Sequence, residues 1–189
     1  FTLDLSNPTN PKVMGELKIT GFSSYIHPLG ENHLMTIGKA ADREGRIKGV
    51  QLQIFDVSDM TNPTRVHQEL ISTGRWSSWS EAMWNHHAFT YHPGRDMLAF
   101  PVNIYEWNEL DGENFSGLLI YSANAKDGFQ RVGRVDHKNL GAQNQRRSWW
   151  TSVRRSIFIE DYVYSLSQRG MKVNGLTDPT QEYAAVPFE

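Results

Sequence analysis

Cysteine is missing from this 189-residue sequence, and its absence excludes disulfides, thiolate metal sites and cysteine nucleophiles. No apolar run is long enough to span a membrane as a helix. The formal net charge of −2 argues against a protein that binds nucleic acid over its whole surface. The sequence also contains no G-x-S-x-G nucleophile motif, no glycine-rich phosphate loop and no dinucleotide fingerprint. These absences remove the enzyme classes that carry the clearest sequence signals.

The residues that are present predict an all-β domain. The chain is long enough to bury a core, and 39% hydrophobic with 12% aromatic residues is the composition of a folded protein. No segment keeps a helical period, whereas short runs of β-branched and aromatic residues alternate with turn-forming residues. This pattern is typical of β-hairpins joined by tight turns.

One phrase occurs twice in the sequence. LDLSNPTNP, at residues 3–11, returns as FDVSDMTNP at residues 55–63. Asp, Ser, Asn and Pro at these positions favour a rigid turn between two strands. Looser copies of the same strand–turn–strand shape occupy residues 118–135 and 170–188. A repeat length of about 50 residues is typical of propellers and solenoids.

A second unit, a β-hairpin, lies between these copies at residues 23–38, 87–102 and 154–167. A hairpin followed by a strand–turn–strand copy gives four antiparallel strands, which is the blade of a β-propeller. We therefore predict an all-β propeller fragment of about three and a half blades. We expect the remaining blades to come from a preceding segment or from a separate chain. The expected parts are a half blade at 1–20 and blades at 21–71, 72–137 and 138–189, the last two each with a long leading loop.

Four phrases in the chain resemble a known family. They are LDLSNPTNPKVMGELKITGFSSYIHPLGENHLMTIG, LQIFDVSD, NHHAFTYHP and RRSIFIEDYVYSLSQRGMKVN. They are similar to the C-terminal β-propeller domain family of secreted bacterial and archaeal proteins, which is distantly related to WD-repeats. The resemblance implies a propeller fold, a location outside the cell or in its envelope, and no established enzymatic activity. Where the family usually reads DHKAF, this sequence reads NHHAF.

The predicted long loops fall on one face of the propeller. The turns inside the predicted hairpins are tight, whereas residues 39–49, 72–85, 103–116 and 136–152 form longer connections at the opposite ends of the strands. Insertions on one face of a repeat array commonly mark the binding side. The alternative is that they are tolerated surface loops.

The first candidate binding loop is rich in tryptophan. It contains Trp76, Trp79 and Trp84, followed by His86 and His87. Indole rings can stack on sugars or bases, or contact a protein partner. The alternative is that the loop packs on itself or against the remaining blades.

The second candidate loop combines basic and aromatic residues. This combination suits an anionic ligand, whereas the net charge makes nucleic acid an unlikely partner. An acidic run at residues 106–113 either pairs with the basic loop or holds calcium, although its spacing does not match the helix-flanked calcium loop. The residues of the basic loop are Arg146, Arg147, Trp149, Trp150, Arg154 and Arg155.

His86 and His87 are expected on an inner strand, where neighbouring side chains point to opposite faces and do not chelate one metal together. We therefore predict structural histidines and no metal site. His86 or His87 and Arg154 or Arg155 begin inner strands, so these residues are expected around the mouth of the central channel. Glu81 is the one acid near His86 that a catalytic mechanism would use, and its partner acid would lie outside the chain.

Two functions remain open from the sequence. The first is a non-catalytic binding scaffold, secreted or associated with the cell envelope, that takes a protein, a carbohydrate or an anionic ligand on the long-loop face without a cofactor. The second is a hydrolase-like enzyme whose channel active site needs the remaining blades. An enzyme predicts a buried acid with a perturbed pKa near His86.

Overall fold

The computed structural model describes residues 1–72, 78–105, 114–140 and 151–188. The chain begins with a half blade of two antiparallel strands, β1 (Thr2–Asp4) and β2 (Lys12–Gly15). The first blade follows as a four-stranded sheet in the order β3-β4-β5-β6. Its strands are β3 (Phe22–Leu29), β4 (His33–Ala41), β5 (Ile47–Asp56) and β6 (Thr64–Leu70).

The middle blade has the order β11-β10-β9, and two short strands share the inner edge of β9. Its strands are β7 (Ser78–Trp79), β8 (Thr90–His92), β9 (Met97–Ile104), β10 (Phe115–Asn124) and β11 (Gly128–Asp136).

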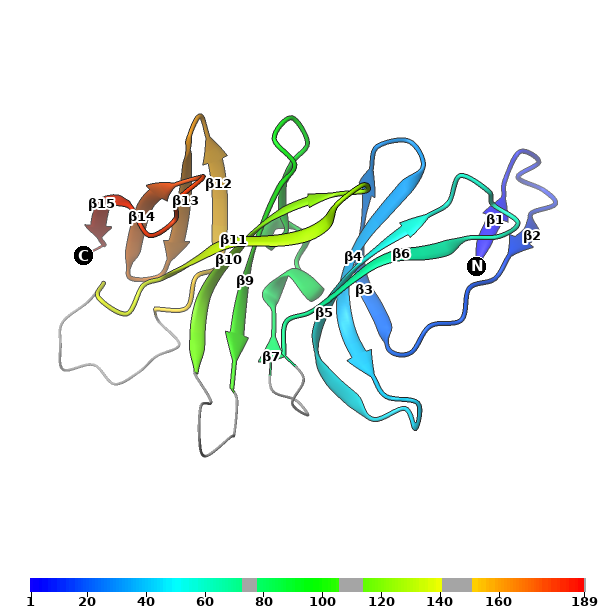
Figure 1. The fold of residues 1–189 in the computed structure, drawn as a ribbon, viewed down its shortest axis with the longest axis horizontal. Helices are drawn as coiled ribbons and strands as arrows, with labels where there is room; N and C mark the ends of the chain where they lie inside the picture. Colours follow the sequence, from blue (N-terminus) through cyan, green and yellow to red (C-terminus); the bar gives the residue numbers. More distant parts are fainter. Residues whose placement is uncertain (73–77, 106–113, 141–150, 189) are drawn as a thin grey trace.

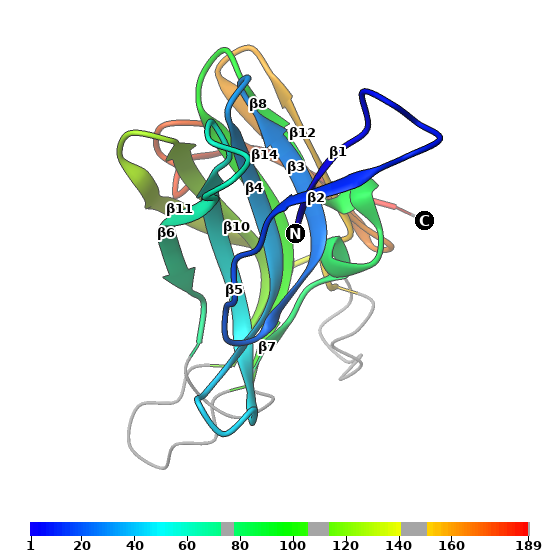
Figure 2. The same ribbon diagram turned by 90° about the vertical axis from the view of Figure 1, so that its right-hand side faces the viewer.

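The last blade is again a four-stranded sheet, in the order β12-β13-β14-β15. Every pair of neighbouring strands in the three blades is antiparallel. Figure 1 shows the blades standing side by side in chain order, and Figure 2 shows β3, β8 and β12 toward one side with β6 and β11 toward the other. The predicted all-β architecture of four-stranded propeller blades is confirmed. The strands of the last blade are β12 (Arg155–Ile159), β13 (Tyr162–Ser167), β14 (Gly170–Gly175) and β15 (Glu182–Pro187).

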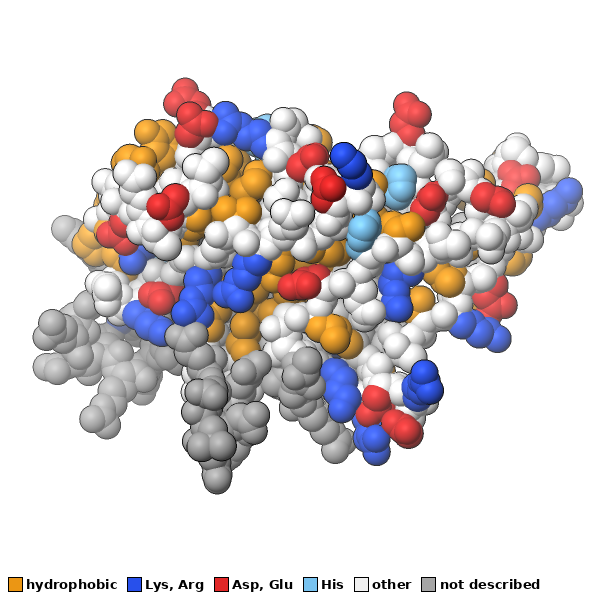
Figure 3. All heavy atoms as spheres, in the orientation of Figure 1, with side chains coloured by type: hydrophobic (Ala, Val, Ile, Leu, Met, Phe, Trp, Pro, Cys, Tyr) orange, Lys and Arg blue, Asp and Glu red, His pale blue; other side chains and the backbone are white. Residues whose placement is uncertain are grey.

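Tight turns join the two inner strands of each blade at the upper edge of Figure 1. Gly30 (φ 66°) turns β3 into β4, Asp96 (φ 53°) turns β8 into β9, and Glu160 (φ 52°) turns β12 into β13. Glycine adopts left-handed backbone angles without a steric cost, and Asp tolerates them, so the sequence explains the turns at Gly30 and Asp96 but not the turn at Glu160. Figure 3 shows acidic and basic side chains on these turns, and hydrophobic side chains where neighbouring blades meet.

The core consists of two layers, one on each side of the middle blade. Alternate residues of β9 face opposite sides: Leu98 and Phe100 pack against the first blade, whereas Met97 and Ala99 pack against the last blade. Side chains along a strand alternate in this way, so an apolar run such as MLAFPV is buried on both faces. The middle blade therefore connects the other two through a continuous apolar interior.

The repeated phrase folds into the same turn at both places. The backbone N–H of Ser6 donates to the Asp4 carboxylate at 2.9 Å, and the N–H of Ser58 donates to Asp56 at 2.8 Å. Hydrogen bonds from the backbone and side chain of Ser6 lower the pKa of Asp4, and those from the side chain and backbone of Ser58 lower the pKa of Asp56. The next turn residues repeat a second bond, from the Thr9 N–H to Asn7 Oδ1 and from the Thr61 N–H to Asp59 Oδ1. The phrase recurs because the same capped turn recurs.

One detail differs from the expectation. The predicted long loop at 39–49 is shorter, because β4 continues to Ala41, β5 begins at Ile47, and Asp42 accepts hydrogen bonds from the Glu44 and Arg46 backbone. Among the described residues, no helix is long and apolar enough to cross a membrane. The half blade lies in front of the first blade in Figure 2, and Leu3 remains 50% exposed.

Candidate ligand-binding pocket

The inner strand of the middle blade is interrupted. β7 pairs with the end of β9 and β8 pairs with its beginning. The chain between them forms two short 3-10 turns, η1 (Glu81–Met83) and η2 (His86–Ala88). Each turn begins with a capping side chain: Ser80 Oγ accepts from the Ala82 N–H, and Asn85 Oδ1 accepts from the His87 N–H. Such local bonds offer the backbone an alternative to the sheet.

The predicted strand position of His86 and His87 was wrong. Both residues lie in η2, both are exposed, and their ring centroids are 4.0 Å apart instead of on opposite faces. The segment HHAFTYH has the composition of a strand, but Asn85 caps a turn immediately before it. Within the described part of the chain, no group of three or more His, Cys, Asp or Glu side chains is arranged to hold a metal ion.

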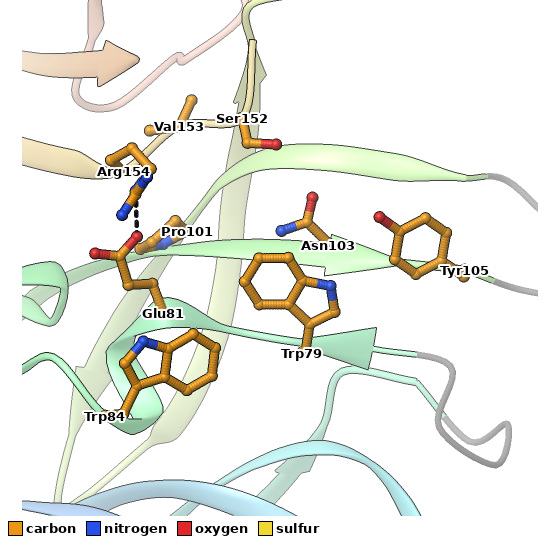
Figure 4. A pocket seen from close by; sticks show the side chains of 9 residues that line it. All are labelled: Trp79, Glu81, Trp84, Pro101, Asn103, Tyr105, Ser152, Val153 and Arg154. Carbon is orange, nitrogen blue, oxygen red and sulfur yellow. Dashed lines mark hydrogen bonds and ion pairs between the residues drawn. The ribbon is translucent and has the colours of Figure 1, made fainter. Parts of the chain in front are cut away.

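A cavity of about 230 Å³ opens beside this interruption (Figure 4). Trp79 and Trp84 come from β7 and the end of η1, Asn103 lies on β9, and Arg154 precedes β12 of the last blade. The pocket therefore lies between the middle and last blades, on the inner side where the sequence predicted the channel mouth. The backbone pairing of the inner strand with β9 stops between Ser80 and Phe89, and the Ser80 hydroxyl donates to the Pro101 carbonyl on this edge.

Trp79 and Trp84 form one wall of the cavity. Their rings are stacked, with centroids 5.7 Å apart and planes inclined by 19°. Trp79 is 38% exposed and Trp84 is 66% exposed, so a large apolar surface faces solvent. Both were predicted as candidate binding residues, and the structure brings them together. Trp76, the third residue of that prediction, lies outside the described residues.

Glu81 is a buried carboxylate clamped by two arginines from the last blade. Arg155 Nη1 donates to Glu81 Oε1 at 2.7 Å, Arg154 Nε donates to Oε2, and Asn85 Nδ2 donates to Oε1 at 3.0 Å. Burial pushes the pKa of Glu81 upward, but the hydrogen bonds and charges of Arg154 and Arg155 outweigh it and hold the pKa below its usual value. Glu81 is therefore ionised at neutral pH.

Two polar side chains of the pocket, Arg154 and Asn103, line the cavity. The Arg154 side chain is 50% exposed, and among the described residues only its Nε has a partner. Asn103 is 4% exposed and lines the cavity, so its side-chain amide is placed to meet a ligand there.

Sequence reasoning found some of these residues and missed others. Arg154, Arg155, Trp79 and Trp84 were predicted, and the structure places them in or beside one pocket. Asn103 was missed, although a lone amide in the apolar run MLAFPVNI is a detectable signal. The other predicted residues lie outside the described part of the chain: Arg146, Arg147, Trp149, Trp150 and the acidic run at 106–113.

Comparison with known proteins gives one family and two relatives. The β-propeller domain family matches residues 1–178. An uncharacterized protein of Archaeoglobus fulgidus is 33% identical over 173 residues, which are 92% of this chain and 22% of that protein. An uncharacterized protein of Methanocaldococcus jannaschii is 31% identical over 175 residues, with the same coverage of 92% and 22%. The chain thus spans 22% of the length of each of these relatives.

Proposed function

Because the chain belongs to the β-propeller domain family, we propose that it is a non-catalytic binding scaffold whose ligand enters the pocket beside Trp79 and Trp84. Propellers place pockets and loops around a central channel, and binding sites are concave, partly apolar and supplied with a few directed polar groups. The stacked indole pair that lines one cavity with the Asn103 amide is the observation that carries the proposal.

The geometry supports binding better than catalysis. A general acid must hold a proton near neutral pH, whereas the lowered pKa of Glu81 keeps this carboxyl group ionised and bound to Arg154 and Arg155. Glycoside hydrolysis also needs a second carboxyl group across the substrate, and Glu81 is the one acid among the described residues that line the cavity. An enzyme completed by further blades remains the second candidate. Glu81 is a buried acid with a shifted pKa near His86, as that function predicts, but the pKa is lowered, which does not suit a general acid.

The proposal extends to the setting of the scaffold. We propose that the remaining blades of the ring come from elsewhere in the same protein or from another chain. The two-stranded half blade, the exposure of Leu3 and Leu5 (50% and 62%) and the greater length of the relatives support this. The proposed location, secreted or in the cell envelope, follows from the family resemblance in the sequence.

Binding to an array of neutral and acidic glycans tests the function. The full-length protein that contains this chain is compared with Trp79→Ala and Trp84→Ala, and with Tyr183→Ala as a control aromatic that is 53% exposed on β15. We expect the native protein and the control to bind at least one glycan class, and each Trp variant to bind it at least roughly tenfold more weakly with an unchanged melting temperature.

Two results would overturn the proposal. If mass spectrometry shows that the bound glycan is cleaved or modified, the protein is an enzyme and not a scaffold. If both Trp variants lose their cooperative unfolding transition, the indoles are structural and the pocket is not the binding site. The same substitution at Trp76, Trp149 and Trp150 measures how far the binding face extends along the predicted long loops.

A further inference from the structure

The pocket has two chemically different sides. The stacked indoles of Trp79 and Trp84 offer a flat apolar surface, whereas Asn103, Tyr105 and Ser152 place an amide and two hydroxyl groups along the rest of the lining. In Figure 4 the amide of Asn103 and the ring of Tyr105 follow one another along β9 and its end, beside Trp79. A sugar ring matches this arrangement, because one face carries C–H groups and the edge carries hydroxyl groups. Burial of the C–H face on indole is favourable, and the edge hydroxyls pair with the polar lining.

The size of the cavity limits the ligand to a small unit. At about 230 Å³ it is below the range of roughly 300–1,000 Å³ that holds drug-sized ligands. A single sugar ring fits that space, and a chain of rings would continue outward along the exposed Trp84. Because Trp84 is more exposed than Trp79, the inner ring would lie against Trp79 and Asn103.

The charged cluster at the end of the pocket carries an excess positive charge. Glu81 contributes one negative charge, and Arg154 and Arg155 contribute two positive charges, so one positive charge is left unbalanced among the described residues of the cluster. Arg155 is directed to the Oε1 atom of Glu81 and to the backbone carbonyl of Arg154. Arg154 lines the cavity and donates its Nε hydrogen to Glu81, and no residue in the described ranges bonds its two terminal amino groups, which can therefore reach a ligand.

An arginine whose Nε is fixed presents its two terminal amino groups as a planar fork. Such a fork binds a carboxylate through two parallel hydrogen bonds, and its orientation here is set in advance by Glu81. We propose that the pocket binds a uronic acid residue of an acidic polysaccharide, with the sugar ring on Trp79 and the carboxylate on Arg154. This inference rests on the proposed binding function and names the ligand class of the same pocket.

Paired acidic and neutral oligosaccharides test the inference in the full-length protein. The probes are trimers of galacturonate, glucuronate and mannuronate, each compared with its methyl ester, which keeps the ring and removes the charge. Isothermal titration measures both affinities. We expect at least one acid to bind at least roughly tenfold more tightly than its ester, because a hydrogen-bonded charge pair contributes that much. We also expect this preference to weaken as salt is raised from 50 to 300 mM.

Variants assign the preference to residues. Arg154→Gln should bind the acid and the ester equally, and Arg154→Lys should keep only part of the preference because an ammonium cannot bind both oxygens in the same geometry. Arg65→Gln, on the exposed outer strand β6, is the matched control and should behave as the native protein. If Arg154→Gln does not fold, the native protein itself gives the test. A preference for the acid that weakens as salt is raised comes from the charge of the carboxylate, and a preference that salt does not change overturns the inference.

The possible failures separate this inference from the proposed function. Equal binding of an acid and its ester overturns the assignment of the carboxylate to Arg154, while the scaffold function stands. Binding of sulfated or phosphorylated glycans without uronates also overturns it, since the anion is then tetrahedral. If no uronate trimer binds but the glycan array gives a Trp84-dependent ligand, the ligand class is wrong and the pocket is right. If the array gives no ligand at all, the proposed function fails.

Discussion

The two contacts between neighbouring blades are held together in different ways. Between the first and middle blades, the large apolar cluster around Leu52, Leu98 and Phe100 fills the space. Polar bonds, among them Lys39 with Ser78, His67 with Ala125 and Tyr121 with Glu69, also cross this contact, but none of these is an ion pair. Between the middle and last blades the apolar cluster around Ala99, Leu118 and Val163 is smaller, and polar bonds cross the contact along its length. These bonds are Thr90 with Ser156, Arg95 with Asp161, Ser116 with Ser152, His137 with Ser165 and Ser167, and Glu81 with Arg154 and Arg155.

The difference shows why the pocket lies where it does. An apolar contact needs regular strands that interdigitate, and β3 and β4 provide them without interruption. The interrupted inner strand of the middle blade contributes Ala82, Ala88 and Phe89 to the apolar cluster with the first blade. On the side of the last blade, ion pairs and hydroxyl bonds surround a cavity lined with polar groups. The two contacts should therefore respond differently to lost volume, lost charge and pH.

The largest effect is expected from a cavity in the first contact. Phe100 is fully buried and stacks on Tyr121 with ring centroids 6.0 Å apart. Phe100→Ala should lower the free energy of unfolding by about 3–5 kcal/mol, because the lost contacts add to the cost of an unfilled space. Chemical denaturation at pH 7.5 measures it. A loss below about 1 kcal/mol would mean that the first contact is loosely packed and that the comparison is wrong.

The second effect concerns the charge cluster in the other contact. The double variant Arg154→Met and Arg155→Met leaves Glu81 buried without a positive partner, and should cost about 3 kcal/mol. Glu81→Gln should cost less, because the arginines are 50% and 35% exposed and can turn to water. Denaturation of both variants gives the order, and a greater loss for Glu81→Gln would show that Glu81 is not the buried member of the cluster.

The pH dependence of stability should come mainly from the second contact. His137 is fully buried between Ser165 Oγ and Ser167 Oγ, each at 2.8 Å, and burial followed by the charge of Lys172 lowers its pKa from 6.5 to about 4, against the opposing charges of Asp136 and Glu182. As the pH falls below 6.5, His137 becomes protonated in the unfolded chain but stays neutral in the folded chain. The free energy of unfolding should therefore fall by about 2–3 kcal/mol between pH 7.5 and 4.5.

The variant His137→Gln keeps a hydrogen-bonding side chain and removes the titration. Its stability should change less over the same pH range, with a residual slope from His27, whose pKa burial also lowers. Phe100→Ala should keep the slope of the native protein, since it leaves both histidines in place. Identical slopes for the native protein and His137→Gln would show that the second contact is not the pH-sensitive one.

The sequence predicted the blades because strand and turn signals are local. Alternating apolar residues, the repeated Asp–Ser turn and the left-handed Gly30 each act within a few residues. The sequence did not predict the interruption of the inner strand, because HHAFTYH has strand composition and the two capping residues, Ser80 and Asn85, decide the matter. The sequence also did not predict the full pocket, because Glu81 and Arg154 are 73 residues apart in the chain and come into contact only in the folded protein.

The smallest effect should come from the repeated turn, which belongs to neither of the two contacts. Asp56 and Asp4 make the same hydrogen bond, but among the described residues only the Asp56 turn contacts a neighbouring element. Thr2 Oγ1 donates to the Met60 carbonyl of this turn, and a side chain at Gly15 would lie 2.5 Å from the same carbonyl. Asp56→Ala should therefore lower the melting temperature by a few degrees and weaken the packing of the half blade. Asp4→Ala should remove the hydrogen bond of its own turn and have a smaller effect on the melting temperature. Hydrogen exchange at the Ser58 and Ser6 amides measures the two losses.

Glycan binding should be unchanged in both variants, because the pocket lies on the other side of the first contact. An Asp56→Ala protein of normal stability that no longer binds its glycan would show that the repeat serves the ligand and not the fold.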